Sequence, residues 1–182
     1  MTRTDKGKHG EDSVYMWLRS VGIKTYRANY HAPFDLYTQA GTRIEVKTGE
    51  PRSLVKRGSK KVWGWKFNIH RHGNSRGHQY VDVYVLRLEL NTGVFRQLGM
   101  GNACHLIIKR AEFDDILTVQ CSVRMLMTKF ARYFNDVAVI RDSDAAKTIE
   151  DRKNTLFRAR PVDSFAASAA YDKLLDRYLP VG

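Results

Sequence analysis

The chain has 182 residues, of which 43% are hydrophobic, enough for the core of one domain, alone or with an appendage. Its 31 lysines and arginines exceed its 19 acidic residues, which gives a formal net charge of +12 at pH 7. This balance favours a polyanionic partner, usually a nucleic acid and alternatively an anionic membrane surface.

Several classes of protein are excluded at this level. The sequence holds no apolar run long enough to cross a bilayer, and its first residues lack the apolar segment of a signal peptide. Cys104 and Cys121 lie far apart, and neither has a Cys or His at the spacing of zinc ligands. We therefore expect a cytoplasmic protein with reduced thiols, no zinc site and no membrane association.

The first predicted element is a helix over residues 8–21. Its apolar residues recur at the spacing of one helix face: Val14, Trp17, Leu18 and Val21. Glu11 lies three residues before Val14, at the end of the same face. A carboxylate on the buried side needs a partner, such as a metal-bound water or Lys47. The alternative is an acid that simply favours the positive end of the helix dipole.

A short strand over residues 23–28 leads to a predicted hairpin over residues 34–49. Polar and apolar residues alternate on both arms of this hairpin, and Gly41 lies in the turn between them. We expect these apolar residues to lie behind the polar face: Phe34, Leu36, Ile44 and Val46. The same alternation places three polar residues together on the other face: Asp35, Glu45 and Lys47.

These three side chains have a chemical interpretation. Two neighbouring carboxylates repel each other unless a cation lies between them, and Mg²⁺ or Mn²⁺ prefers such oxygen ligands. Lys47 on the same face can hold a hydroxide nucleophile or stabilise charge on a phosphate. The alternative is the polar face of a surface hairpin with a Glu–Lys pair.

The segment Pro33-Phe34-Asp35, followed after a short interval by Glu45-Val46-Lys47, resembles the signature of the PD-(D/E)xK nuclease superfamily. Restriction enzymes, archaeal Holliday junction resolvases and some homing endonucleases belong to it. Phe34 departs from the literal motif because it separates the proline from the aspartate. The family also carries an acidic residue on a helix before the hairpin, and Glu11 stands at that place.

The resemblance implies an α/β fold with a restriction-endonuclease-like core, in which helices flank a mixed central sheet, over roughly residues 8–110. It implies that Asp35, Glu45 and the carbonyl of Val46 hold Mg²⁺ or Mn²⁺. Lys47 would then position or activate the attacking water, and Glu11 would bind metal through water or a second ion.

Residues 50–79 are strongly basic, with no acidic residue after Glu50. We expect these side chains to contact the phosphates of a nucleic acid: Arg52, Lys56, Arg57, Lys60, Lys61, Lys66, Arg71 and Arg76. The alternative is a solvated run of charge. Alternating aromatics at 63–67 predict a strand with one packed face, and residues 70–78 predict a loop that orders on DNA.

The remaining elements are a long central strand over residues 80–90, strands over 94–98 and 105–109, and a helix over 118–139. We interpret Asp82 as structural rather than as a metal ligand. The wide aromatic stripe within residues 123–137 is explained most simply by packing of this helix on the sheet. Its width also suits a subunit interface, so we expect a homodimer or higher homo-oligomer. Residues 141–163 read as a linker, and residues 165–179 as a shorter helix. The nuclease-like domain would thus span 8–139, and a C-terminal helical extension 140–182.

Together these patterns predict a metal-dependent endonuclease that hydrolyses the phosphodiester bonds of double-stranded or branched DNA, of a homing or phage type. The alternatives are a Holliday junction resolvase, an RNA-processing nuclease, and a non-catalytic nucleic-acid-binding module on a nuclease scaffold. The presence of all four residues of the proposed chemistry argues against the last: Glu11, Asp35, Glu45 and Lys47.

Overall fold

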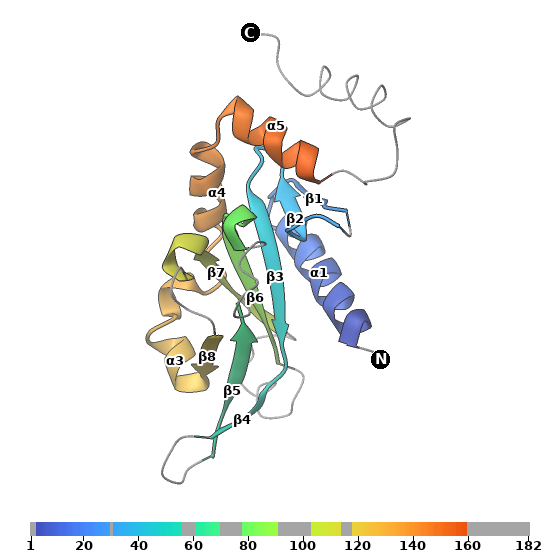
Figure 1. Cartoon of the computed structure of the whole chain (residues 1–182). Helices are drawn as coiled ribbons and strands as arrows, with labels where there is room; N and C mark the ends of the chain where they lie inside the picture. The colour runs from blue at the N-terminus through green and yellow to red at the C-terminus, as the bar shows by residue number, and fades with distance from the viewer. Residues whose placement is uncertain are drawn as a thin grey trace.

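The computed structural model describes residues 3–29, 31–55, 61–69, 78–90, 103–113 and 118–159 (Figure 1). The chain folds as a mixed α/β structure in which a mixed central sheet is covered by helices on one face and by a smaller sheet on the other. The predicted α/β class with a mixed sheet is confirmed. The second sheet was not predicted, because helices alone were expected on the flanks.

The central sheet has five strands. In spatial order they are β1 (Thr25–Arg27), β2 (Leu36–Thr38), β3 (Arg43–Gly49), β6 (Val83–Glu89) and β7 (Ala103–Lys109). Strands β3 and β6 run parallel, and the other neighbours are antiparallel. The predicted hairpin is confirmed in β2 and β3, with Gly41 at a φ of 101° in its turn. The predicted central strand is confirmed as β6, which is buried between β3 and β7.

Helices α1 (Arg3–Ser20) and α4 (Ala138–Ala145) cover one face of this sheet. The apolar core on this side includes Val14, Leu18, Ile44, Val46 and Ile140. The stripe predicted for the first helix is therefore the buried face of α1. Helix α1 begins before residue 8, so the predicted start was too late.

The other face is covered by the smaller sheet, whose strands are β4 (Arg52–Val55), β5 (Lys61–Asn68) and β8 (Thr118–Ser122). Trp65, Phe67 and Leu86 belong to the core between the two sheets. Phe34 also belongs to this core, whereas Leu36 belongs to the core under α1. The expectation that these two side chains share a face was wrong, because Phe34 lies in the bend before β2, where strand alternation has not begun.

The helix predicted over residues 118–139 was wrong. Val119 and Cys121 alternate with exposed or half-buried neighbours in β8 and pair with Phe67 and Trp65 of β5. Ser122 then caps a short helix, α3 (Val123–Met127), by accepting a hydrogen bond from the backbone N–H of Met125. Further along, the left-handed backbone of Asn135 (φ 50°) precludes a continuous helix.

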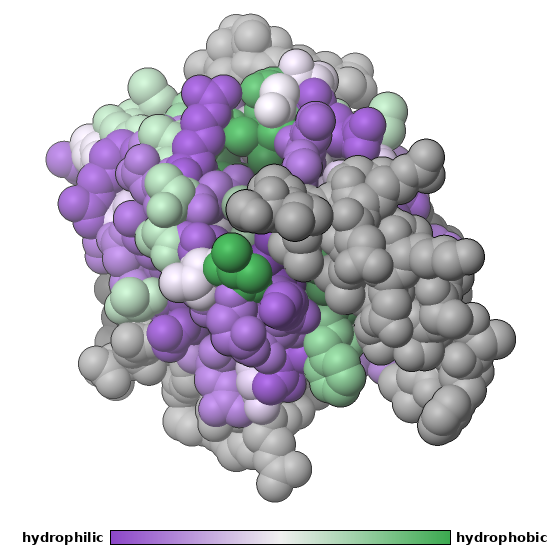
Figure 2. Space-filling view, turned by 90° about the horizontal axis from the view of Figure 1, so that it is seen from above, coloured by the Kyte–Doolittle hydropathy of each residue, from purple (hydrophilic) through white to green (hydrophobic). Residues whose placement is uncertain are grey.

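Most residues of the predicted aromatic stripe lie in the core of their own chain, whereas Met127 is exposed. Leu126, Phe130 and Tyr133 are buried between the two sheets, and Phe134 packs against them. They are not a free surface for a second subunit. Among the residues coloured in Figure 2, the face seen from above is mainly hydrophilic, with apolar residues in small groups. The homo-oligomer stays a prediction that has lost this support.

Residues 141–163 were expected to be a linker, but their described part is helical. Ile140 of α4 is fully buried under the sheet, so the predicted domain boundary falls inside this helix. Helix α5 (Ile149–Arg158) begins with a capping box of Thr148 and Asp151. Its Thr155 hydroxyl donates to the carbonyl oxygen of Gly41 at 2.8 Å, which docks α5 on the hairpin turn.

Some predicted elements concern residues that the structure does not describe. The strand over 94–98, the helix over 165–179 and most of the loop over 70–78 lie outside the described residues. Short 3₁₀ turns at His78–Tyr80, Arg110–Phe113 and Ala131–Tyr133 complete the described structure. Within that structure, no helix has the length and apolar character needed to cross a membrane.

Candidate active site

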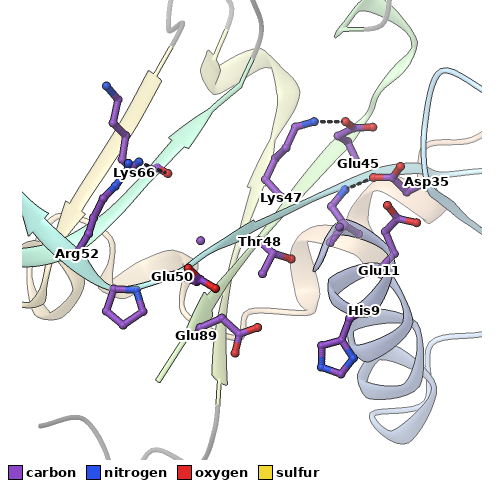
Figure 3. Close-up of a pocket in the computed structure, with 14 residues that line it drawn as sticks. His9, Glu11, Asp35, Glu45, Lys47, Thr48, Glu50, Arg52, Lys66 and Glu89 are labelled. Atoms are coloured by element: carbon purple, nitrogen blue, oxygen red, sulfur yellow. Dashed lines mark hydrogen bonds and ion pairs between the residues drawn. The ribbon is translucent and has the colours of Figure 1, made fainter. Parts of the chain in front are cut away.

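All four residues predicted to carry the chemistry line one open cleft of about 980 Å³ (Figure 3). They come from separate parts of the chain: Glu11 from α1, Asp35 from the bend before β2, and Glu45 and Lys47 from β3. In Figure 3 the carboxylates of Glu11, Asp35 and Glu45 lie near one another at the same end of the cleft. The tertiary structure thus brings together the four residues that the sequence analysis grouped as one site.

The cleft exists because β2 is short. Strand β2 pairs with β3 only as far as Ile44, so no strand of the described structure lies beside the following part of β3 on that edge. Asp35 occupies the edge instead, where its Oδ2 accepts a hydrogen bond from the backbone N–H of Val46 at 2.7 Å. The N–H and C=O of one strand residue point to the same side, so the Val46 carbonyl shares the side of Asp35.

Glu45 and Lys47 project from the face of β3 that is turned toward the smaller sheet. Their register partners on β6 are Tyr84 and Leu86, both in the core between the sheets. Ile44 and Val46 alternate with them and are buried on the opposite face, behind the polar residues as predicted, where α1 covers them. The ammonium group of Lys47 forms an ion pair with Oε1 of Glu45, so the lysine and one predicted metal ligand are in contact.

Glu11 reaches the edge of β3 because α1 packs very closely against that strand. The contact is made by Gly10: a Cβ at this position would lie 1.8 Å from Oγ1 of Thr48. No residue larger than glycine fits without a shift of helix or strand. The next residue, Glu11, is thereby held at the open edge, beside Asp35 in Figure 3.

The pKa values of Asp35 and Glu11 are raised. Burial is the largest cause for Asp35, and the negative charges of Glu45 and Glu11 add to it, against the Val46 N–H and Lys47. The pKa of Glu11 is raised by burial and then by Glu45 and Asp12. Burial lowers the pKa of Lys47, but the surrounding carboxylates outweigh it and raise the pKa overall. The site therefore has an excess of negative charge, which one protonated lysine does not balance.

This donor set fits a hard divalent cation. Across the described ranges, no three side chains of His, Cys, Asp or Glu are grouped as a complete set of metal ligands. Mg²⁺, however, keeps several waters and is commonly bound through one or two carboxylates. Asp35 and Glu45, with the Val46 carbonyl, form a set of that kind, and Glu11 is placed to bind through water. A cation here would also relieve the repulsion that raises the pKa of Asp35.

Two of the predicted phosphate-binding residues line the same cleft. Arg52 of β4 and Lys66 of β5 are exposed there, and Nη2 of Arg52 donates to the carbonyl oxygen of Lys66 at 3.2 Å. Lys61 belongs to β5, but its side chain lies outside the described structure. The other predicted residues lie outside the described ranges: Lys56, Arg57, Lys60, Arg71 and Arg76.

Asp82 has the structural role that the sequence favoured. Its carboxylate accepts hydrogen bonds from the guanidinium of Arg43 at 2.9 and 3.0 Å and forms an ion pair with Lys147 at 2.9 Å. Burial raises the pKa of Asp82, but the bonds from Arg43 and Lys147 outweigh it and lower the pKa overall. The residue ties β3 and β6 to the turn before α5, away from the cleft.

Sequence reasoning missed several residues that line the cleft. Thr48 and Glu50 lie within three residues of the motif, and this nearness was the signal available for them. The alternation of β3 turns Thr48 away from Glu45 and Lys47, toward α1. Glu89 and His9 carried no such signal. Glu89 lines the cleft because β6 lies parallel to β3, with Gly49 opposite Leu88. A local sequence pattern does not predict which strands pair.

Comparisons of the chain with models of protein families, with curated proteins and with solved structures find no match. What can be said of function therefore depends on the geometry and charge of this cleft.

Proposed function

We propose that this chain is a metal-dependent endonuclease that hydrolyses phosphodiester bonds in DNA. The observation that supports it most is the meeting of Glu11, Asp35, Glu45 and Lys47 in one cleft. A surface hairpin with an incidental Glu–Lys pair would not require a third and a fourth charged residue from other elements. The parallel β3–β6 pair, with α1 packed against β3, is consistent with a restriction-endonuclease-like core.

Each residue has a role in this proposal. Asp35, Glu45 and the Val46 carbonyl would hold Mg²⁺ or Mn²⁺, which supplies a water of lowered pKa and neutralises phosphate charge. Lys47 stays protonated beside the carboxylates and is placed to bind the attacking water or a phosphate oxygen. Glu11 orients water through its carboxylate. Arg52 and Lys66 bind flanking phosphates, which aligns the strand in the cleft.

We retain the homing or phage type as the preferred subclass and the Holliday junction resolvase as the alternative. Enzymes that cut symmetric targets work as dimers or higher oligomers, so subunit number helps to separate these types. The thiols of Cys104 and Cys121 are free and buried, in keeping with a protein of the cytoplasm.

A cleavage assay tests the proposal. Supercoiled plasmid, linear duplex, synthetic four-way junctions and structured RNA are incubated with the protein in Mg²⁺, Mn²⁺ or EDTA. Wild type is compared with Glu11→Gln, Asp35→Asn and Lys47→Ala. The matched control is Asp12→Asn, since Asp12 is the neighbouring acid on α1 but pairs with Arg27 at 2.9 Å outside the cleft.

We expect metal-dependent cutting that Asp35→Asn and Lys47→Ala abolish, that Glu11→Gln reduces, and that Asp12→Asn leaves unchanged. The preferred substrate then distinguishes the subclasses. Tight binding of DNA without cutting in either metal, unaltered by the cleft substitutions, would reject the enzyme and leave a nucleic-acid-binding module.

A further inference from the structure

A group of charged and aromatic side chains lies where α1 contacts β1, the edge strand of the central sheet (Figure 1). Asp12, Tyr15 and Arg19 recur at i, i+3 and i+7 along α1, so they share one face of this helix. Tyr15 and Arg19 directly follow Val14 and Leu18, which α1 buries against the sheet. The face that carries the group therefore adjoins the buried face of the helix.

Arg27 of β1 joins this group, because its Nη2 forms an ion pair with Oδ1 of Asp12 at 2.9 Å. The Cζ atoms of Arg27 and Arg19 lie 4.7 and 5.5 Å from the centroid of the Tyr15 ring, within the range of cation–π contact. Nη1 of Arg19 also donates to the Tyr15 hydroxyl and to the carbonyl oxygen of Thr25, each at 3.4 Å. We call these four side chains, Asp12, Tyr15, Arg19 and Arg27, the edge cluster.

The edge cluster is both exposed and positively charged. The side chain of Arg27 is 50% exposed and Arg19 is exposed, whereas Tyr15 is half-buried against the core under α1. Asp12 supplies one negative charge against two guanidinium groups. Each guanidinium is a planar fork of N–H donors that matches phosphate oxygens, and one held in place beforehand loses less entropy on binding.

The edge cluster adjoins the end of the cleft that holds the carboxylates. Arg27 pairs with Leu36 in the register of β1 and β2, and Asp35 is the next residue toward the cleft. The backbone N–H of Ala28 donates to the carbonyl oxygen of Asp35 at 2.9 Å, which continues this pairing. Burial and nearby acids raise the pKa of Glu11, and the charge of Arg27 opposes them. Arg27 is therefore close enough to act on a residue of the cleft.

Positive charge thus lies beyond both ends of the carboxylate group. In Figure 3, Arg52 and Lys66 lie at the opposite end of the cleft from Glu11 and Asp35. Arg27 lies past Asp35, on the other side. A polyanionic strand that crosses the cleft would be repelled by the carboxylates and attracted on either side of them.

We propose that Arg27 and Arg19 bind a phosphate of the DNA backbone, on the other side of the carboxylates from Arg52 and Lys66. The ligand is the phosphodiester itself, so the contact positions the strand and carries no base preference. The place of this contact relative to the cut rests on the proposed endonuclease function, but the binding does not.

Binding in EDTA tests the contact separately from any cutting. The full chain is titrated into a short fluorescein-labelled duplex at several salt concentrations, and into vesicles of phosphatidylserine and phosphatidylcholine. The variants are Arg27→Gln, Arg19→Gln and Arg27→Lys, the last of which keeps the charge. The matched control is Arg141→Gln, since Arg141 is exposed on α4, which contacts β6 and β7 at the far side of the sheet from β1. Asp12→Asn keeps an oxygen that accepts from Arg27, so it remains a suitable control for cutting.

We expect Arg27→Gln and Arg19→Gln each to weaken duplex binding about threefold to tenfold and to reduce the salt dependence by about one counterion. Arg27→Lys should keep the salt dependence and most of the affinity, and Arg141→Gln should bind within about twofold of wild type. Binding by the two glutamine variants equal to that of Arg141→Gln would overturn the proposal. A loss in Arg27→Lys as large as in Arg27→Gln would also overturn it, because the residue would then support the fold rather than bind phosphate. Loss of vesicle binding with DNA binding intact would assign the edge cluster to an anionic membrane surface instead.

Uncharged methylphosphonates at successive backbone positions test where the contact lies. The weakening by Arg27→Gln should disappear when the methylphosphonate replaces the phosphate that Arg27 contacts. The weakening by Lys66→Ala should disappear at a position on the other side of the cut. Both positions on the same side would contradict the placement of the edge cluster.

The two proposals fail in different ways. If wild type cuts no DNA but Arg27→Gln still loses affinity and salt dependence, the nuclease is rejected and the phosphate contact stands. If wild type cuts DNA and Arg27→Gln binds the duplex as wild type does, the phosphate contact is rejected and the nuclease stands.

Discussion

The backbone N–H of Val46 donates to Oδ2 of Asp35 across 2.7 Å, and this bond joins the two halves of the motif. It holds Asp35 at the edge that β2 leaves open, one residue from Glu45 along the partner strand. The same bond explains how a buried carboxylate with two acidic neighbours is tolerated, because an N–H donor stabilises the charged form. The site is therefore preorganised but electrostatically unfavourable without a cation.

The first prediction concerns Asp35→Asn. The amide oxygen of asparagine can still accept from the Val46 N–H, while the buried negative charge is lost. In EDTA at pH 7 we expect this variant to be more stable than wild type by about 0.5–2 kcal/mol, although it does not cut DNA. Urea denaturation measures the difference. Asp12→Asn, at an exposed ion pair, should stay within about 0.5 kcal/mol of wild type.

This stability difference should depend on pH with a definite sign. The pKa of Asp35 is raised in the folded chain above its ordinary value of 3.8. Below that value Asp35 is protonated in both the folded and the unfolded chain, so its ionisation does not change the free energy of unfolding. As pH rises above 3.8 the unfolded chain loses this proton first, so wild type loses stability relative to Asp35→Asn until pH passes the folded pKa. A difference that shrinks as pH rises would contradict the raised pKa.

Lys47 and Lys66 should affect different steps. Lys47→Ala removes the cation beside the reacting groups, and we expect single-turnover cleavage to fall about 10²–10³-fold with modest loss of DNA affinity. Lys66→Ala removes an exposed charge of the cleft, so it should weaken binding and reduce the salt dependence by about one counterion. Rates at saturating enzyme, and dissociation constants at several salt concentrations, separate the two. Equal effects on both steps would contradict the assignment.

The contact between α1 and β3 can be tested at Gly10. A methyl group there would collide with Oγ1 of Thr48, so Gly10→Ala should cost about 1–3 kcal/mol of stability and displace Glu11. Adding Thr48→Ala removes the hydroxyl and should recover part of the loss. Gly7→Ala is the matched control on the same helix, since its Cβ would meet only Oε1 of Glu11, at 3.9 Å. That change should stabilise by up to about 1 kcal/mol.

Asp82 provides the contrast with the carboxylates of the cleft. Asp82→Asn loses its ion pairs with Arg43 and Lys147, and we expect a loss of about 1–3 kcal/mol of stability at pH 7 with cleavage per folded molecule unchanged. Because the folded pKa of Asp82 is lowered, its stabilisation is complete above 3.8 and disappears as pH falls through the lowered value. A specific loss of metal response in this variant would reassign Asp82 to the site.

The sequence by itself determined the features that depend on local pattern. Alternation predicted the hairpin, the separation of Glu45 and Lys47 from Ile44 and Val46, and the burial of β6. Spacing predicted the buried stripe of α1. These were readable because each depends on side-chain direction within one element, which the backbone geometry fixes. The composition set the strongly basic charge, which no fold alters.

The tertiary structure alone decided which elements meet. The helical spacing of Val123, Leu126 and Phe130 led us to expect a helix from residue 118 onward. Val119 and Cys121 instead pair with β5, because a buried partner strand outweighs weak local preference. The parallel pairing of β3 with β6 brings Glu89 to the cleft, and the Gly10 contact brings Glu11 to Asp35. These contacts join residues far apart in the chain, so packing and hydrogen bonding between elements fix them, not local sequence.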